Sequence, residues 1–421
     1  MKVPGWLPTL LGFLTAVGPL STDMYLPSFP AIEGALKLEP GSAQITLATW
    51  FAGLAVGQIL QGTLADRFGR RWPLLVGTVV YAVANLGCSL APDLWSLSAL
   101  RFVAAVGGSA SMVIPRAIVR DLSNGIAAAR LMAKLSLVMA VAPILAPSLG
   151  AAIMEAFSWH AIFVITTVYG AVCAVVVYWW LPDTLPREHR LKLRFYGLMT
   201  RYGRVARDRQ FVLFSLVGAF GMFGMFAYLG GSPGVFIDTW HLTPARYAVM
   251  FSCNAACFIL GSQISPRLLP RFGAHKVLRV GVAGYVLATA ALLFVAMSGW
   301  GGLYALILPL TATMFSCGFI MPNAAVGALS RQGAQAGTAS ALMGTLQFCI
   351  AAVSGVLVGV LANGTAVPMA VLMLGGALCA LTFDLKRAVP PPLSAAPTRT
   401  PAATAHATAV AEGAVTGEGI P

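Results

Sequence analysis

Two ionisable side chains stand inside long apolar stretches of this sequence, and their chemistry suits proton exchange. Asp23 lies in GPLSTDMYLP, and Arg101 opens RFVAAVGG. A charged group at bilayer depth costs roughly 2.5 to 3.5 kcal/mol on insertion scales, so each must face a wet cavity or a partner. Burial favours the neutral carboxyl and a nearby guanidinium favours the carboxylate, so Asp23 between these influences can exchange a proton. We predict that Asp23 and Arg101 serve in proton coupling; the alternative is that Asp23 is a solvated residue at a helix end.

Other patterns that carry chemistry are missing from the sequence, which argues against an enzyme. It has no GxxxxGKS/T phosphate-binding loop and no nucleophile beside a base. The seven cysteines lie in apolar runs without the CxxC or Cys/His spacing of a metal site. We therefore predict no cofactor and no metal, and we expect energy to come from an ion gradient and not from ATP.

The composition requires lipid as the surrounding medium for these residues. Hydrophobic residues make up 58% of the chain and charged residues 10%, and the mean hydropathy is +0.81. These values lie well outside the range of soluble domains. Apolar runs of about 20 residues recur from Trp6 nearly to Leu385. We predict an all-α membrane protein with twelve transmembrane helices at residues 6–26, 45–64, 73–91, 97–119, 132–154, 161–181, 211–231, 246–265, 278–298, 303–326, 338–361 and 367–385.

The basic residues occur in alternate loops, and this pattern predicts the topology. They cluster within residues 67–71, 120–134, 187–209 and 267–279, whereas Lys37 and Arg246 alone fall on the opposite side. This is the positive-inside pattern, and it places both termini in the cytoplasm. The net charge of +13 therefore reports topology, and no nucleic-acid partner is predicted.

The two halves of the chain repeat one another. Arg-Phe-Gly at residues 67–69 recurs at 271–273, and MVIPRAIVRDL recurs as FIMPNAAVGAL. A parallel repeat predicts an N-terminal six-helix bundle at 1–181 and a C-terminal bundle at 211–385, joined by a cytoplasmic linker at 182–210. Residues 386–421 are poor in large apolar groups, so we predict a disordered cytoplasmic tail. The second half lacks four charges of the first half, since Pro270, Asn323, Gly327 and Ala328 stand where the first half has Asp66, Arg116, Arg120 and Asp121. We therefore expect ion coupling and most charge-based gating in the first half.

The most specific motif is GTLADRFGRRW, which begins at Gly62 and resembles the signature of the major facilitator superfamily. The resemblance implies that the glycines permit a turn and close helix packing, while Asp66 pairs with cations or with the positive end of the eleventh span to hold the cytoplasmic side shut. RFVAAVGG resembles the superfamily's arginine motif associated with proton transfer. The predicted cytoplasmic gate comprises Gly62, Asp66, Arg67, Gly69, Arg70, Arg71, Arg116, Arg120 and Asp121.

The fifth predicted span contains APILAPSLG, with Pro143, Pro147 and Gly150. Prolines bend a helix, and small neighbours allow another helix to approach. The segment resembles the proline and glycine motif that marks antiporters in the superfamily, although Ala146 and Ala151 stand where glycine is often found. A simple packing kink is the alternative.

TDMYLP together with IPRAIVRD resembles the Bcr/CflA branch of drug:proton antiporters, and the resemblance covers nearly the whole chain apart from the tail. The branch implies export of amphenicol, bicyclomycin, sulfonamide or similar compounds, and some members handle metabolites such as nucleosides. Aromatic and amide groups are the candidates for a mostly apolar substrate cavity, in which a buried amide needs a partner. They are Tyr25, Trp50, Gln58, Met139, Phe223, Phe226, Asn254, Asn323 and Gln347.

These patterns together predict a monomeric, proton-coupled antiporter that exports amphiphilic small molecules, including antibiotics, across a bacterial inner membrane by alternating access. The alternative within transport is a proton-coupled transporter of a natural metabolite such as a nucleoside, including an importer. A membrane receptor built on the same fold is the alternative outside transport, and it would tolerate Asp23→Asn and Arg101→Ala.

Overall fold

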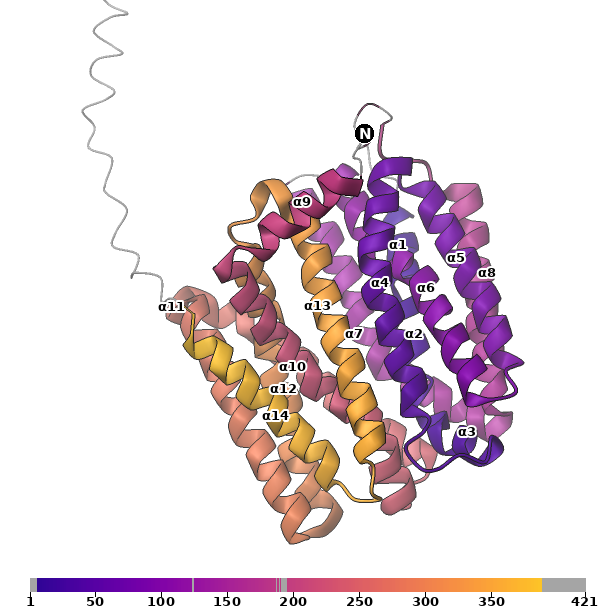
Figure 1. Ribbon diagram of the computed structural model, residues 1–421, viewed down its shortest axis with the longest axis vertical. Helices are drawn as coiled ribbons and strands as arrows, with labels where there is room; N and C mark the ends of the chain where they lie inside the picture. The colour runs from indigo at the N-terminus through magenta and orange to yellow at the C-terminus, as the bar shows by residue number, and fades with distance from the viewer. Residues whose placement is uncertain (1–5, 123–124, 187, 189, 191–194, 388–421) are drawn as a thin grey trace, which may run out of the picture. The chain divides into compact units, whose positions relative to one another are not determined.

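The computed structural model describes residues 6–122, 125–186, 188, 190 and 195–387 (Figure 1). The all-α prediction is confirmed, since the described residues form helices and no strand. The first half contains α1 (Leu7–Thr15), α2 (Val17–Thr22), η1 (Leu26–Ser28), α3 (Phe29–Ala35), α4 (Gln44–Phe68), α5 (Arg71–Ser89), α6 (Leu94–Leu122), α7 (Gly125–Ala156) and α8 (Trp159–Trp180). The remainder contains α9 (Phe195–Ala206), α10 (Arg209–Pro233), the π-helix η3 (Gly234–Thr239), α11 (Pro244–Ser298), α12 (Gly302–Leu329), η4 (Gly333–Gln335), α13 (Ala336–Leu361) and α14 (Val367–Leu385).

Ten of the described helices are long and apolar enough to cross a membrane by length and composition, against twelve predicted spans. Two local features explain the difference. The first predicted span is divided, because α1 ends at Thr15 and α2, which begins at Val17, ends before Asp23. The eighth and ninth predicted spans are joined in the 55-residue α11, which has a non-helical residue at Gly273. With these two features, the described helices account for all twelve predicted spans.

The Arg-Phe-Gly repeat has a structural counterpart in two similar turns. Gly69 has φ 93° and Gly273 has φ 77°, a region that glycine enters without strain. Gly69 ends α4 just before α5 begins, and Gly273 marks the kink of α11. A side chain at Gly69 would also collide with the carboxylate of Asp183.

Many large apolar side chains of the described helices are exposed, as expected of a surface that faces lipid. On α5 and α11 they include Val83, Leu287 and Phe294, which are exposed by 65%, 71% and 66%. Exposed tryptophans lie at helix ends, where indole rings suit the boundary between lipid and water. They include Trp95, Trp179, Trp180 and Trp300.

The two halves pack together chiefly through two pairs of helices, α4 with α13 and α7 with α11. Figure 1 shows α13 beside α4 along much of its length. We call the end of the helices that carries Arg70 and Arg120 the basic end, and the opposite end, which carries α3 and residues 36–43, the far end. The halves contact one another at the far end. There Gln44 Nε2 donates to the carbonyl of Gly230 at 3.2 Å, and the rings of Phe51 and Phe226 lie 4.0 Å apart.

Candidate functional site

At the basic end of the first half, Arg70 holds together residues from three separate segments. Its Nη1 donates to Asp66 Oδ1 at 2.6 Å and its Nε to Asp121 Oδ2 at 2.7 Å, while its backbone N–H donates to Asp183 Oδ1 at 2.9 Å. Burial by itself lowers the pKa of Arg70, but the hydrogen bonds to Asp121 and Asp66 outweigh it, so the pKa is raised. The structure therefore brings together Asp66, Arg70 and Asp121, which the sequence assigned to one gate.

The remaining predicted gate residues lie around this cluster without joining its ion pairs. Arg71 donates to the carbonyl of Tyr178, and Arg67 stacks on Phe68 with its guanidinium carbon 5.3 Å from the ring centre. Asp66 bonds to Arg70 and not to the first turn of α13, although both line the same cavity. Gly62 also lines that cavity, together with Arg116 and Arg120.

Arg101 lies in a buried box of aromatic rings deep in the first half. Its side chain is 1% exposed, and its guanidinium carbon lies 4.5 Å from the ring centres of both Tyr25 and Trp50 and 5.9 Å from that of Phe163. Its Nη1 donates to the carbonyl of Ser21 at 3.0 Å. Nε and Nη2 have no hydrogen-bond partner among the described residues. A planar cation between two rings is well stabilised, yet it keeps two donors available.

Asp23 follows α2 and is 7% exposed. The structure does not pair it with Arg101: within the described ranges Asp23 has no ion pair, and Arg101 bonds to the backbone two residues earlier. Asp23 instead lies within electrostatic range of Tyr228 and Tyr247 in the second half. Asp23 and Arg101 therefore lie in the same region of the first half but do not bond to one another in this conformation.

The hydroxyls near Asp23 belong to buried polar groups that join α10, α11 and α12. Asn254 Nδ2 donates to Tyr228 Oη at 3.1 Å, and Thr311 Oγ1 donates to Asn254 Oδ1 at 2.8 Å. The hydroxyls of Ser232 and Tyr247 lie 2.8 Å apart. Asn254 was predicted from the sequence; Tyr247, Ser232 and Thr311 were missed, and hydroxyl side chains in apolar spans were the available signal.

The other predicted cavity residues divide into packed and cavity-lining groups. Tyr25 and Trp50 hold Arg101, and Phe226 packs on Phe51. Asn323 Nδ2 donates to Ser265 Oγ at 2.6 Å, so its amide is occupied within the second half. Phe223 lies 6.3 Å from the ring of Phe220, and the amide of Gln347 lies against Gly218. Gln58 and Met139 line cavities.

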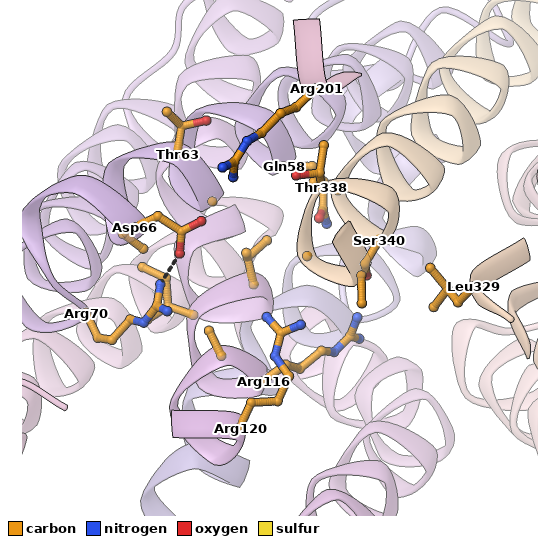
Figure 2. Close-up of a pocket in the computed structure, with 18 of the residues that line it drawn as sticks. Gln58, Thr63, Asp66, Arg70, Arg116, Arg120, Arg201, Leu329, Thr338 and Ser340 are labelled. Carbon is orange, nitrogen blue, oxygen red and sulfur yellow. Dashed lines mark hydrogen bonds and ion pairs between the residues drawn. The ribbon is translucent and has the colours of Figure 1, made fainter. Parts of the chain in front are cut away.

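A cavity of about 250 Å³ opens between the halves near the basic end (Figure 2). It is bordered by α4, α6 and α7 of the first half and by α9, α12 and α13. A second cavity, of about 280 Å³, lies among α1, α6, α7 and α11. Arg116 lines both. With the far end closed by contacts between the halves, these two cavities lie toward the basic end.

The predicted antiporter motif lies in α7, beside this region. Pro143 and Pro147 are both inside the helix, and Pro143 lines the second cavity. Gly150 packs against the backbone of Met24, the residue after Asp23. The motif therefore contacts both a cavity and the segment that carries the predicted coupling residue.

A second buried charge cluster, which was not predicted from the sequence, lies at the end of α14. Asp384 is fully buried, and it accepts hydrogen bonds from Arg279 Nε at 3.1 Å and from Arg387 Nη2. Arg387 also lies over Phe214, with its guanidinium carbon 4.6 Å from the ring centre. The predicted disordered tail begins at residue 386, but Arg387 is packed against the helices and is 4% exposed. The second half thus carries an acidic and basic cluster of its own.

Comparison with known proteins gives consistent matches over most of the chain. The family model described as Major Facilitator Superfamily matches residues 11–356. The uncharacterized MFS-type transporter YdgK of Bacillus subtilis is 35% identical over 366 residues, covering 86% of this chain and 90% of that protein. The bicyclomycin resistance protein homolog of Haemophilus influenzae is 30% identical over 359 residues, covering 85% and 90%. The chloramphenicol resistance protein of Pseudomonas aeruginosa is 31% identical over 287 residues, covering 68% and 67%.

Solved structures show the same fold at low sequence identity. The human organic anion transporter MFSD10 has a TM-score of 0.67 at 18% identity, covering 91% of this chain and 99% of that chain. The xylose transporter XylE from E. coli has a TM-score of 0.66 at 13% identity, covering 91% and 96%. Together with the curated relatives, these structures confirm the predicted twelve-helix fold and the predicted resemblance to bicyclomycin and chloramphenicol resistance proteins.

Proposed function

We propose that this chain, which belongs to the Major Facilitator Superfamily, exports amphiphilic small molecules across a bacterial inner membrane in exchange for protons. Its curated relatives include proteins named for bicyclomycin and chloramphenicol resistance. The observation that carries the proton-coupling part is Asp23, a buried carboxyl without a cationic partner among the described residues, beside the segment that Arg101 holds. A buried carboxyl of this kind can take up and release a proton when its surroundings change between conformations.

The exchange follows from where Asp23 lies relative to the two halves. In this conformation Asp23 is buried, and Tyr228 and Tyr247 of the second half lie within electrostatic range of it. When the halves separate at the far end, water reaches the carboxyl and supplies a proton. When they close there again, the available donors of Arg101 offer a charge that favours release of the proton. The proton gradient then drives the cycle by which the cavity is presented to alternate sides.

Export is the proposed direction, and it agrees with a basic end that is cytoplasmic, as the positive-inside pattern predicts. The cavities then open to the cytoplasm, where an exporter collects its substrate. Asp66 lines the cavity opposite Gly337 in the first turn of α13. We propose that, when the cytoplasmic side closes, its half-exposed carboxylate meets the positive end of that helix.

A growth screen tests the export function. An efflux-deficient host expressing the wild type, Asp23→Asn or an empty vector is challenged with chloramphenicol, bicyclomycin, a sulfonamide and toxic nucleoside analogues. The expected result is that the wild type alone raises the inhibitory concentration of at least one compound. Identical growth of the three strains across the panel would remove the basis of the proposal, and increased sensitivity of the wild type would indicate an importer.

A further inference from the structure

The cavity at the basic end carries more positive charge than its surroundings neutralise. Four arginines and one acid, Asp66, line it (Figure 2). Asp66 is already bonded to Arg70, which also engages Asp121 outside the lining. The other three arginines have no hydrogen-bond or ion-pair partner within the part of the chain that the structure describes. They are Arg116, Arg120 and Arg201.

Two of these guanidinium groups face the same space from one helix. Arg116 and Arg120 are four residues apart on α6, so they project from one face, and each acts electrostatically on the other. Figure 2 shows them side by side near Ser340, while Arg201, from α9, lines the same cavity with its guanidinium group nearer to Thr63. Like charges held this close repel one another, and an anion between them relieves the repulsion.

The opposite wall adds further donors for an anion. α13 begins at Ala336, and its first residues line the cavity, with no side-chain cap from Gln335. The first N–H groups of a helix have no partner inside the helix and carry partial positive charge. A Cβ placed on Gly337 would lie 3.9 Å from both terminal nitrogens of Arg120, so the guanidinium faces this first turn. Thr338 and Ser340 supply hydroxyls to the same space.

We infer that this cavity binds the anionic group, a carboxylate, sulfonate or phosphate, of an amphiphilic substrate. Guanidinium groups bind such planar or tetrahedral anions by paired, charge-assisted hydrogen bonds. The apolar part of the substrate would extend past Arg116 into the second cavity, which Met132, Leu135 and Phe258 line. The inference rests on the proposed export function, for which it names the substrate class.

A substrate bound at this site would also help to close the cavity. Arg120 belongs to the first half and the first turn of α13 to the second, so an empty cavity sets a cation against a positive helix end. A bound anion lies between them and favours approach of the halves. An amphiphilic acid should therefore promote closure of this cavity, whereas a neutral analogue should not.

A pair of probes that differ only in charge tests the inference. The full chain is purified in phosphatidylcholine nanodiscs, and binding of dansylglycine is compared with binding of dansylglycinamide by dansyl fluorescence. We expect the acid to bind about tenfold more tightly than the amide, as one charge-assisted interaction supplies. R116Q/R120Q should remove this preference, and R116K/R120K should retain part of it. The matched control, R267Q/R271Q, removes two exposed arginines with the same spacing on α11 and should leave it unchanged.

Several outcomes would overturn the inference. Equal dissociation constants for the two probes would do so, as would an acid preference that survives in R116Q/R120Q. Binding of the amide by this variant reports that it is folded, and the single variant R120Q provides the same comparison if the double variant aggregates. Displacement of dansylglycine when phosphatidylglycerol is added to the nanodiscs would assign the anion to lipid and overturn the substrate class.

The binding test is independent of the proposed function, because it needs no gradient and no transport. If the wild type binds the acid no more tightly than the amide but still exports a compound in exchange for protons, only the substrate class is overturned. Acid-selective binding by a protein that shows no proton-driven transport supports the binding site and overturns the export function.

Discussion

Gly150 of α7 lies against the backbone carbonyl of Met24, so close that a methyl group at position 150 would collide with the carbonyl oxygen. Met24 follows Asp23 directly, and Gly150 ends the proline and glycine motif of α7. The fit therefore links that motif to the segment that carries the proposed proton carrier. The prolines bend the helix, while the glycine lets it approach.

Gly150→Ala should reduce transport because the segment around Asp23 must move to admit the methyl group. Forcing a larger residue into a close contact costs about 1 to 3 kcal/mol. We expect a lower melting temperature and at least about tenfold slower transport in vesicles. The control is Gly375→Ala in α14, where nothing lies within 4 Å of an added Cβ. Equal transport by the two variants would contradict the proposed link.

Arg101→Lys should abolish proton coupling although the charge is kept. An ammonium group cannot stack its plane between Tyr25 and Trp50 while donating to Ser21, so we expect a loss of about 1 to 2 kcal/mol in unfolding free energy. The measurement is proton flux on addition of substrate, followed with an internal pH dye. Arg246→Lys, an exposed change at the start of α11, serves as the control. Normal flux in Arg101→Lys would show that the aromatic box is not needed.

Arg70→Gln should destabilise the basic end of the first half because it leaves Asp66 and Asp121 without their shared partner. Breaking a buried pair costs more than breaking an exposed one, and Asp66 is half-exposed, so we expect about 1 to 3 kcal/mol. Thermal unfolding monitored by tryptophan fluorescence measures the effect. Arg67→Gln removes an exposed neighbouring charge and should change the melting temperature little. Similar losses in both variants would mean that general loop charge, and not the cluster, matters.

Asp384→Asn should destabilise the second half by about 3 kcal/mol, because Arg387 would remain a buried cation without its carboxylate. The same unfolding assay measures it, with the exposed change Glu39→Gln as the control. An unchanged melting temperature in Asp384→Asn would indicate that Arg387 finds another partner or leaves its site.

The sequence predicted the elements well because span length, charge asymmetry and repeated motifs are local properties. It also pointed to Asp66, Arg70 and Asp121, which the structure joins, because each belongs to a motif at a helix end. It missed the cluster around Asp384 because an acid at the edge of an apolar span resembles a solvated helix end. The helix α9 was missed because its segment reads as a basic linker.

The packing between distant segments was the least predictable feature. Asp23 and Arg101 were expected to lie near one another, but which groups each side chain contacts was not predicted: Arg101 bonds to the Ser21 carbonyl and stacks on two rings. The fit of Gly150 against Met24 likewise depends on how α7 lies on the first span, which no local pattern specifies. These contacts belong to one conformation, and the proposed exchange requires at least two.

Transport by purified protein in liposomes, under an imposed pH difference, tests the central claim most directly. The wild type and Asp23→Asn are reconstituted, and uptake is followed of a compound that the growth screen identifies. We predict that the wild type concentrates the compound with an opposing flow of protons, and that Asp23→Asn only equilibrates it. Concentrative uptake by Asp23→Asn, or by the wild type without a pH difference, would contradict the assignment of Asp23 as the proton carrier.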